Sequence, residues 1–211
     1  MERNTLHIKI GIGIPTYNRF DLLQPNLFLY SRDFIDTDLF IVDNGNQGIM
    51  FTPAQILTLE KNIGVGASWN LMLKKIFENN NYALILNDDI YLGKKIHEII
   101  ALIQSKPDKF IRATPDWCAF IIPKSVYEAV GDFDEIFYPA YYEDKSYEYR
   151  MKLKGIPIIV SPDLNPYQYS NSRSAEKDPT LLENRKKNKK LFIEMWGGEP
   201  EREKFKKPFN K

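Results

Sequence analysis

Two adjacent carboxylates follow an apolar run in the first half of the chain, in the sequence Asn87-Asp88-Asp89. Neighbouring negative charges repel, so such a pair at an exposed strand end is costly unless a cation or hydrogen-bond donors compensate it. Mg²⁺ or Mn²⁺ suits this arrangement, because these ions accept one or two carboxylates and take their other ligands from phosphate and water. The alternative is structural, with Asp89 capping a helix that begins near Gly93. The pair alone supports both interpretations equally, and its position after a predicted strand favours the metal.

A second acidic pair, Glu143-Asp144, stands just ahead of a predicted helix. Four tyrosines surround it in the sequence: Tyr138, Tyr141, Tyr142 and Tyr147. Among such rings a carboxylate loses part of its hydration, which raises its pKa toward the range of a general base. Acidic residues are also common at helix starts, where they compensate the helix dipole. For this pair alone, the structural explanation is the favoured one.

The segment 62–70, Asn-Ile-Gly-Val-Gly-Ala-Ser-Trp-Asn, places small residues where a helix opens. A helix N-terminus attracts anions, so the segment resembles a phosphate cradle. It matches neither the P-loop pattern nor the dinucleotide fingerprint Gly-x-Gly-x-x-Gly. Trp69 can stack on a ligand, although an aromatic residue on a helix is more often part of the core.

The elements that must position these residues alternate along the first half of the chain. The predicted strands are His7–Ile14 (stopped by Pro15), Leu39–Val42, Gln55–Leu59 and Tyr82–Leu86, and the predicted helices are Asp21–Tyr30, Val65–Phe77 and Lys94–Gln104. Such alternation implies crossover connections, and hence an α/β domain with a mostly parallel central sheet flanked by helices. Ligands bind beyond the carboxyl ends of the strands in such sheets.

Polar residues stand at all four of these strand ends. They are Thr16-Tyr17-Asn18-Arg19, Asp43-Asn44, Asn62-Ile63-Gly64 and Asn87-Asp88-Asp89. An α/β domain without a ligand would cap some helices with such residues, but would less often place them at four consecutive strand ends. This pattern predicts a binding site at that edge of the sheet.

The second half of the chain is less regular. Its predicted strands are Phe110–Ala113, Trp117–Ile122 and Ile156–Val160, its predicted helices are Ser125–Val130, Asp144–Leu153 and Leu181–Met195, and a long loop is predicted over 162–178. We divide the chain into a nucleotide-binding half (1–105), an acceptor half (106–178) and a C-terminal helix with a basic tail (179–211).

Composition narrows the class of protein. The 211 residues suffice for one domain, and the net charge of +1 gives no field that argues for nucleic acid. Residues 173–211 carry 12 basic and 7 acidic residues, but the run Arg185–Lys190 is typical of a solvated helix face. One cysteine and two histidines exclude a cysteine-rich or multi-histidine metal site, so carboxylates must hold any metal. The sequence shows no signal peptide and no transmembrane segment, which predicts a cytoplasmic protein.

Taken together, the motifs resemble the GT-A glycosyltransferases, specifically the family-2-like nucleotide-sugar enzymes. The resemblance runs nearly from end to end and rests on the order and spacing of several motifs. These are Ile14-Pro15-Thr16-Tyr17-Asn18-Arg19, Val42-Asp43-Asn44-Gly45, Asn62-Ile63-Gly64 with Asn70, Leu86-Asn87-Asp88-Asp89 in the place of an Asp-x-Asp motif, Gly131-x-Phe133-Asp134-Glu135, Glu143-Asp144 with Arg150, and Trp196-Gly197-Gly198.

The resemblance implies a role for each matching residue. Those implied to bind the donor are Thr16, Asn18, Arg19, Asp43 and Asn44 for the base and part of the ribose, Asn62, Gly66 and Trp69 for the nucleotide pocket, Asp88 for the ribose, and Asn87 beside it. Asp89 would hold Mn²⁺ or Mg²⁺ against the diphosphate. Asp144, or Glu143 beside it, would be the base that deprotonates the acceptor hydroxyl.

The implied reaction is metal-dependent transfer of a hexose-type sugar from a UDP-sugar to a hydroxyl of a glycan or glycoprotein acceptor. The chain departs from the family where Asn87 takes the first motif position, and no histidine follows residue 97. Two alternatives stay open: a sugar-nucleotide-binding module without transferase activity, and a nucleotidyltransferase. The resemblance also implies that the chain is the N-terminal domain of a larger viral protein.

Overall fold

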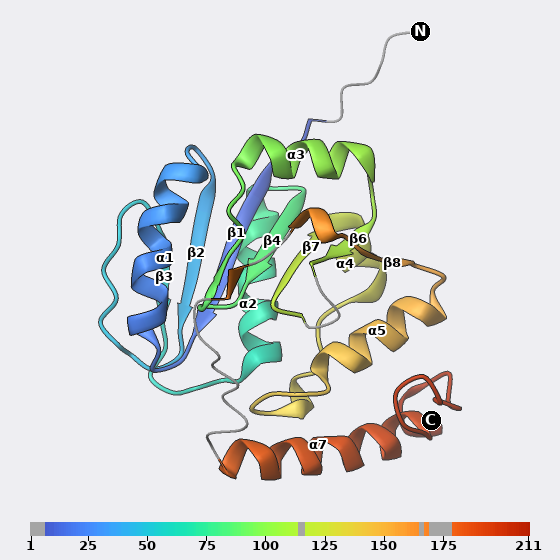
Figure 1. Cartoon of the computed structure of the whole chain (residues 1–211). Coiled ribbons are helices and arrows are strands. Elements are labelled where there is room, and N and C mark those ends of the chain that lie inside the picture. The colour runs from blue at the N-terminus through green and yellow to red at the C-terminus, as the bar shows by residue number, and fades with distance from the viewer. Residues whose placement is uncertain (1–6, 114–116, 165–166, 169–178) are drawn as a thin grey trace, which may run out of the picture.

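Seven strands form one central sheet in the order β3-β2-β1-β4-β7-β6-β8 (Figure 1). The computed structural model describes residues 7–113, 117–164, 167–168 and 179–211. The strands of the sheet are β1 (Ile10–Thr16), β2 (Asp38–Asp43), β3 (Gln55–Thr58), β4 (Tyr82–Leu86), β6 (Phe110–Arg112), β7 (Ala119–Pro123) and β8 (Ile158–Val160). A separate two-stranded sheet pairs β5 (Ile90–Tyr91) with β9 (Tyr167–Gln168).

The central sheet is mostly parallel, as predicted. Parallel pairs join β1 to β2 and β4, β2 to β3, and β6 to β8, whereas β7 runs antiparallel to both β4 and β6. The carboxyl ends of β1, β2 and β4 therefore meet at one edge of the sheet. That edge is where the sequence places its polar clusters.

Helices cover both faces of the sheet (Figure 1). The helices are α1 (Phe20–Asp33), α2 (Val65–Asn79), α3 (Ile96–Ser105), α4 (Lys124–Val130), α5 (Glu143–Leu153) and α7 (Pro179–Trp196), with short 3-10 turns η1 (Glu135–Phe137), η2 (Pro162–Leu164) and η3 (Pro208–Asn210). One buried cluster joins the sheet to α1 and α3, and a second joins its other face to α2, α4 and α5. This two-sided burial explains why β4 is apolar at every position.

Two glycines in β1 let α2 lie close to the strand. A Cβ at Gly11 would lie 2.8 Å from the Ile76 side chain, and one at Gly13 would lie 3.0 Å from the Met72 sulfur. Any larger residue would push α2 away from the sheet. The close approach fixes the N-terminus of α2 beside the strand ends that carry the polar residues.

The first strand continues through Pro15, where the sequence predicted a stop. The Thr16 carbonyl accepts a hydrogen bond from the Asn44 amide and so faces β2. Successive residues of a strand face opposite neighbours, which turns the Pro15 nitrogen toward β4. Because the pairing with β4 ends at Gly13, the missing N–H of proline removes no ladder bond.

Other boundaries shift by a few residues, and several short elements were missed. The third helix spans Ile96–Ser105 instead of Lys94–Gln104, and α1 extends to Asp33 instead of ending at Tyr30. The predicted loop 162–178 contains η2 and β9 among its described residues. The β5–β9 pair escaped prediction because each strand has only two residues.

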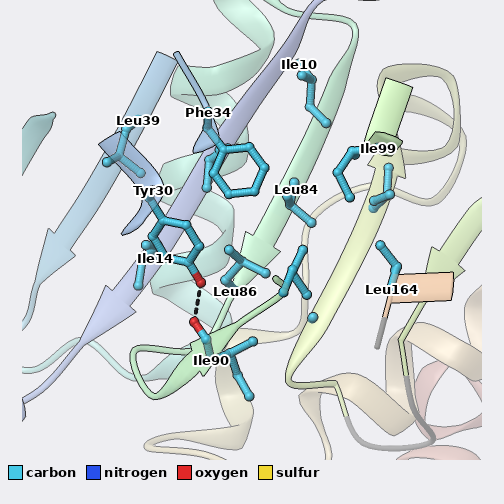
Figure 2. Close-up of a cluster of buried hydrophobic side chains, with 14 of the residues drawn as sticks. Ile10, Ile14, Tyr30, Phe34, Leu39, Leu84, Leu86, Ile90, Ile99 and Leu164 are labelled. Atoms are coloured by element: carbon cyan, nitrogen blue, oxygen red, sulfur yellow. Dashed lines mark hydrogen bonds between the residues drawn. The ribbon is translucent and has the colours of Figure 1, made fainter. Parts of the chain in front are cut away.

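The hydrophobic cluster between the sheet and α1 also fixes the acidic segment after β4. In Figure 2 the Tyr30 side chain lies among Ile14, Leu86 and Ile90, and its hydroxyl donates to the carbonyl oxygen of Ile90. Ile90 follows Asp89 directly, so α1 anchors the end of the acidic turn within the core.

Candidate functional site: the carboxyl ends of the strands and the start of α5

Asp88 lies between the ends of β1 and β4 and is tied to both β1 and α1. Its carboxylate accepts a hydrogen bond from the Thr16 hydroxyl at 2.9 Å, and its backbone carbonyl accepts one from the Asn26 side chain at 3.1 Å. Asn26 is fully buried on α1. The structure thus brings together Thr16 and Asp88, which lie 72 positions apart in the sequence.

The two aspartates after β4 experience different environments. Burial raises the pKa of Asp88 to about 6 against the lowering effect of the Thr16 hydrogen bond, and the charge of Asp89 adds to the rise. Arg19, at the start of α1, opposes it with its positive charge. Asp89 itself is buried. Two adjacent carboxylates, one of them with a pKa raised by burial and by the charge of the other, are a donor set that a divalent ion would stabilise.

The acidic pair fits an ion that takes few protein ligands. Within the described ranges, no group of three or more His, Cys, Asp or Glu side chains could hold a metal by itself. Mg²⁺ and Mn²⁺ do not need such a group when a diphosphate and water complete the coordination. Oxygen ligands from Asp88 and Asp89 match their preference, so the residues present fit such an ion bound together with a nucleotide.

Asp43 uses its carboxylate to hold the loop after β2. It is fully buried and accepts hydrogen bonds from the Gly45 amide (3.1 Å), the Gln47 amide (2.7 Å) and the Gln47 side chain (3.0 Å). This loop in turn lies against Asn18, because a Cβ on Gly45 would fall 2.3 Å from the Asn18 side-chain oxygen. Asp43 therefore shapes the loop, and its direct contact with a base stays a prediction.

Asn44 joins the end of β2 to the start of α2. Its side-chain nitrogen donates to the Ser68 hydroxyl at 2.9 Å, and its side-chain oxygen accepts from the Ile63 amide at 3.1 Å. Asn62 closes the same loop by accepting a hydrogen bond from the Gly64 amide at 2.8 Å. These asparagines hold the cradle loop in place, while Asn18 and Asn87 remain more open to solvent.

Trp69 lies in the core, which is the alternative that the sequence favoured for this residue. Its ring stacks with that of Trp117 and meets Phe120 and Phe133 edge to face. Only 3% of the residue is exposed. The prediction from the family resemblance that Trp69 lines the nucleotide pocket is therefore wrong. The ring packs α2 against the core and is not accessible to a ligand.

The second acidic pair lies beside the cradle. A Cβ on Gly66 would lie 3.4 Å from the Cβ of Glu143, so the first turn of α2 contacts the first turn of α5. The amide of Val65 also donates to the Pro139 carbonyl at 2.8 Å. The predicted nucleotide-binding half and the predicted acceptor half of the chain thus meet at the two predicted functional segments.

Both carboxylates at the start of α5 have raised pKa values. Burial raises the pKa of Glu143 well above its usual range, and the charge of Asp144 adds to the rise. Burial also raises the pKa of Asp144, although the Lys145 charge and backbone amide oppose it. Glu143 is 5% exposed and its Oε2 has no hydrogen-bond partner among the described residues, whereas Asp144 is only partly buried. Asp144 is therefore the more exposed member of the pair.

The turn 131–135 links α2 to α5 through hydrogen bonds and an ion pair, and so holds the start of α5 beside α2. Asn70 on α2 binds both the amide (2.7 Å) and the carbonyl (3.0 Å) of Phe133. Asp134 then accepts from the Ser146 hydroxyl at 2.5 Å and pairs with Arg150 at 3.3 Å, both on α5. Two residues singled out by the family pattern, Asn70 and Arg150, therefore act by positioning the acidic pair.

Asn188 on α7 is a site residue that sequence reasoning missed. Its side-chain nitrogen donates to the carbonyls of Phe137 (2.8 Å) and Ala140 (2.9 Å), in the loop that leads into α5. Arg185, one turn earlier, stacks its guanidinium over the Tyr141 ring at 5.7 Å. In the sequence, Asn188 is the one uncharged residue in the basic run 185–190. Because such a run is typical of a solvated helix face, nothing in the sequence indicated a buried role for it.

Solved structures show the same fold. GalNAc-T7, in a crystal structure with UDP, GalNAc and Mn²⁺, superposes with a TM-score of 0.66 at 10% identity, over 90% of this chain and 48% of that one. Glucosyl-3-phosphoglycerate synthase from Mycobacterium tuberculosis, with Mn²⁺, UDP and glucosyl-3-phosphoglycerate, gives 0.54 at 10% identity, over 86% of this chain and 80% of that one. A Drosophila β1,4-galactosyltransferase 7 mutant with manganese, UDP-Gal and xylobiose gives 0.53 at 11% identity, over 82% and 75%.

The chain therefore has the GT-A fold of nucleotide-sugar glycosyltransferases, as the sequence predicted. It spans about half the length of the GalNAc-T7 chain. No family model and no curated protein sequence matches it. None of the described helices is long and apolar enough to cross a membrane.

Proposed function

We propose that this protein is a glycosyltransferase that moves a hexose-type sugar from a UDP-sugar to a hydroxyl of a glycan or glycoprotein acceptor. The observation that carries the proposal is the contact between the two candidate segments, in which Gly66 of the segment 62–70 packs against Glu143 of the acidic pair. A donor bound across the strand ends beside this contact would present its sugar near the carboxylates of α5. The neighbouring folds, all solved with UDP and manganese, support the same donor class.

The donor would bind across the strand ends. Tyr17 and Asn18 are exposed and Arg19 is half-buried, and these residues would border the site for the base and ribose. Asp43, Asn44 and Asn62 would act mainly by fixing the loops that surround the nucleotide, since their side-chain groups already hold those loops. Asp88 would meet the ribose or the metal from its position beside Thr16.

Asp89, with Asp88, would hold Mn²⁺ or Mg²⁺. When bound, such an ion supplies Lewis-acid stabilisation of the negative charge that develops on the departing diphosphate.

Asp144 would serve as the general base. Its raised pKa brings it nearer to the operating pH, which is what base catalysis requires. The acceptor hydroxyl would give its proton to the Asp144 carboxylate while its oxygen bonds to the anomeric carbon, and the bond to the diphosphate breaks with both electrons leaving on UDP. Burial and the charge of Asp144 raise the pKa of Glu143 well above its usual range, and Glu143 is buried, so we assign the base role to the more exposed Asp144.

Calorimetric titration of UDP, GDP and CMP, each with and without Mn²⁺, tests the donor class. Binding of UDP alone, and only with the metal, is the expected result. Absence of nucleotide binding in every condition would refute the proposal and leave the fold without a donor site. Hydrolysis of a UDP-sugar in the absence of acceptor then separates an enzyme from a module that only binds. The viral origin and cytoplasmic location implied by the sequence stay predictions.

A further inference from the structure

A cavity lies on the outer side of α5, away from the proposed donor site. Its volume is about 510 Å³, and its walls come from α5, from the start of β8 and from the turn near residue 200. Figure 1 shows these three parts of the chain side by side at the C-terminal side of the molecule. Nothing in the mechanism proposed above uses this cavity.

One carboxylate in the cavity has unused hydrogen-bonding capacity. The Glu203 side chain is 5% exposed, and its Oε1 accepts a hydrogen bond from the Glu201 amide at 2.9 Å. Its Oε2 has no hydrogen-bond partner within the described parts of the chain. The Lys152 ammonium lies 3.9 Å from that oxygen, beyond hydrogen-bond distance, on a side chain that is 67% exposed. A buried carboxylate oxygen in this state is costly until a donor reaches it.

The remaining walls suit a neutral, hydroxylated ligand. Ile156, Pro157 and Pro200 form an apolar side, and Tyr149 contributes an aromatic ring. The charges largely compensate one another, because Lys145 pairs with Glu148 at 3.1 Å and Lys152 stands beside Glu203. An apolar wall with a few hydrogen-bonding groups is the usual make-up of a small-molecule site. A sugar ring offers hydroxyl donors for Glu203 and a C–H face for the apolar wall.

The cavity is placed to act together with the candidate base. Lys145, Glu148, Tyr149 and Lys152 line it from one face of α5, at helical spacing. Lys145 follows Asp144 directly, and at 1.5 Å per residue Lys152 lies about 12 Å beyond Asp144 along the same helix. We propose that this cavity is a subsite for a neutral sugar residue of the acceptor glycan, remote from the reacting hydroxyl, with Glu203 accepting a hydrogen bond from a sugar hydroxyl. This inference rests on the proposed glycosyltransferase function for its acceptor.

Amide chemical-shift mapping of the whole chain tests the subsite with xylobiose, lactose, cellobiose and mannobiose. Each is added at about 10 mM, enough to saturate a site whose Kd is about 1 mM. The expected result is that at least one disaccharide shifts the amides of Gly155, Glu201 and Glu203. Glu203→Ala should then weaken that binding about tenfold or more, the scale of a lost hydrogen bond to a charged group. Glu183→Ala, which removes an exposed carboxylate of α7, should leave it unchanged.

The outcomes separate this inference from the proposed function. No shift at these amides with any disaccharide, in a wild-type protein that still binds UDP, would overturn the subsite and leave the donor assignment intact. Shifts produced by methylammonium and by none of the sugars would replace the saccharide with a cationic ligand and also overturn it. Sugar binding here in a protein that fails to bind UDP would support the cavity while refuting the donor site. Because the mapping uses wild-type protein, it does not depend on how Glu203→Ala folds.

Discussion

The side-chain nitrogen of Asn188 donates to the carbonyl oxygen of Ala140 at 2.9 Å, which ties the C-terminal helix to the loop before the candidate base. The same loop carries left-handed backbone at Tyr141 and Tyr142, and α5 begins at the next residue. The second helix reaches this loop as well, through the hydrogen bond from the Val65 amide to Pro139. One asparagine of α7 therefore helps set where Glu143 and Asp144 lie relative to the cradle.

Replacing Asn188 should reduce transfer more than donor binding. Asn188→Asp keeps the shape but points an oxygen at carbonyls that need a donor, so it should be more harmful than Asn188→Ala. Loss of these buried hydrogen bonds is expected to cost about 1–3 kcal/mol of unfolding free energy. Denaturant unfolding and transfer assays measure both effects, with Lys186→Ala on an exposed position of α7 as the control. Equal behaviour of the Asp and Ala variants would contradict the positioning role.

Asp89→Ala should abolish metal-dependent binding of UDP. The side chain is buried at the end of β4, and its oxygen ligands are the reason for assigning the metal there. Calorimetry with UDP and Mn²⁺ measures the effect, with Glu128→Ala, an exposed carboxylate of α4, as the control. Unchanged affinity in Mn²⁺ would remove Asp89 from the metal site.

Asp144→Asn should lower the transfer rate by about 10²–10⁴-fold, the range for losing a general base, without weakening UDP binding. In the wild type, burial raises the pKa of Asp144, so the charged base is lost at a higher pH than for an ordinary aspartate. The transfer rate should therefore fall as the pH falls through this raised pKa. Initial rates across pH test this, and Glu194→Gln on α7 is the matched control. An Asp144→Asn enzyme with wild-type rates would move the base role elsewhere.

Glu143→Gln should stabilise the fold at neutral pH. Since burial raises the pKa of Glu143 in the folded protein, the fold binds a proton that the unfolded chain releases. Its stabilising contribution is thus complete below the unfolded pKa and is lost as the pH rises through the raised folded value. A glutamine avoids this loss, with a gain on the order of 1 kcal/mol per unit of pKa difference. Thermal unfolding at pH 4 to 8 should show the gain growing with pH; a gain that is constant across pH would refute the explanation.

Gly64→Ala should disturb the contact between the two halves of the chain. Gly64 has φ 88° and ψ 167°, a backbone conformation that is essentially restricted to glycine. A Cβ there would also lie 3.0 Å from the Pro139 carbonyl oxygen. The expected cost is about 1–3 kcal/mol. Gly48→Ala, at φ 66° with open space around it, separates the backbone strain from the contact and should cost less in the same unfolding experiment.

The amino-acid sequence by itself determined the fold class and the edge of the sheet that carries the site. Apolar strands such as Tyr82–Leu86 can only be buried on both faces, which requires helices on each side, and the polar residues after each strand then fall at one edge. The acidic segments could be predicted because their residue types are unusual at such positions. These features lie within short segments of the sequence, so they can be recognised without knowing the tertiary contacts of each residue.

Only the tertiary structure decided which of those residues face a ligand and which hold the scaffold. Asp43 and Asn44 have the residue types of ligand contacts, yet their side chains are satisfied by Gln47 and Ser68. The sequence predicts Asn188 on a solvated basic face, whereas in the structure α7 packs onto the loop before α5 and Asn188 donates a hydrogen bond to the Phe137 carbonyl. A polar side chain forms hydrogen bonds with the donors and acceptors that packing places beside it. These partners of the three side chains lie 4 to 51 positions away along the chain. Only the contact between Asp43 and Gln47 is local in sequence, and for Asn44 and Asn188 the packing of distant segments assigns the role.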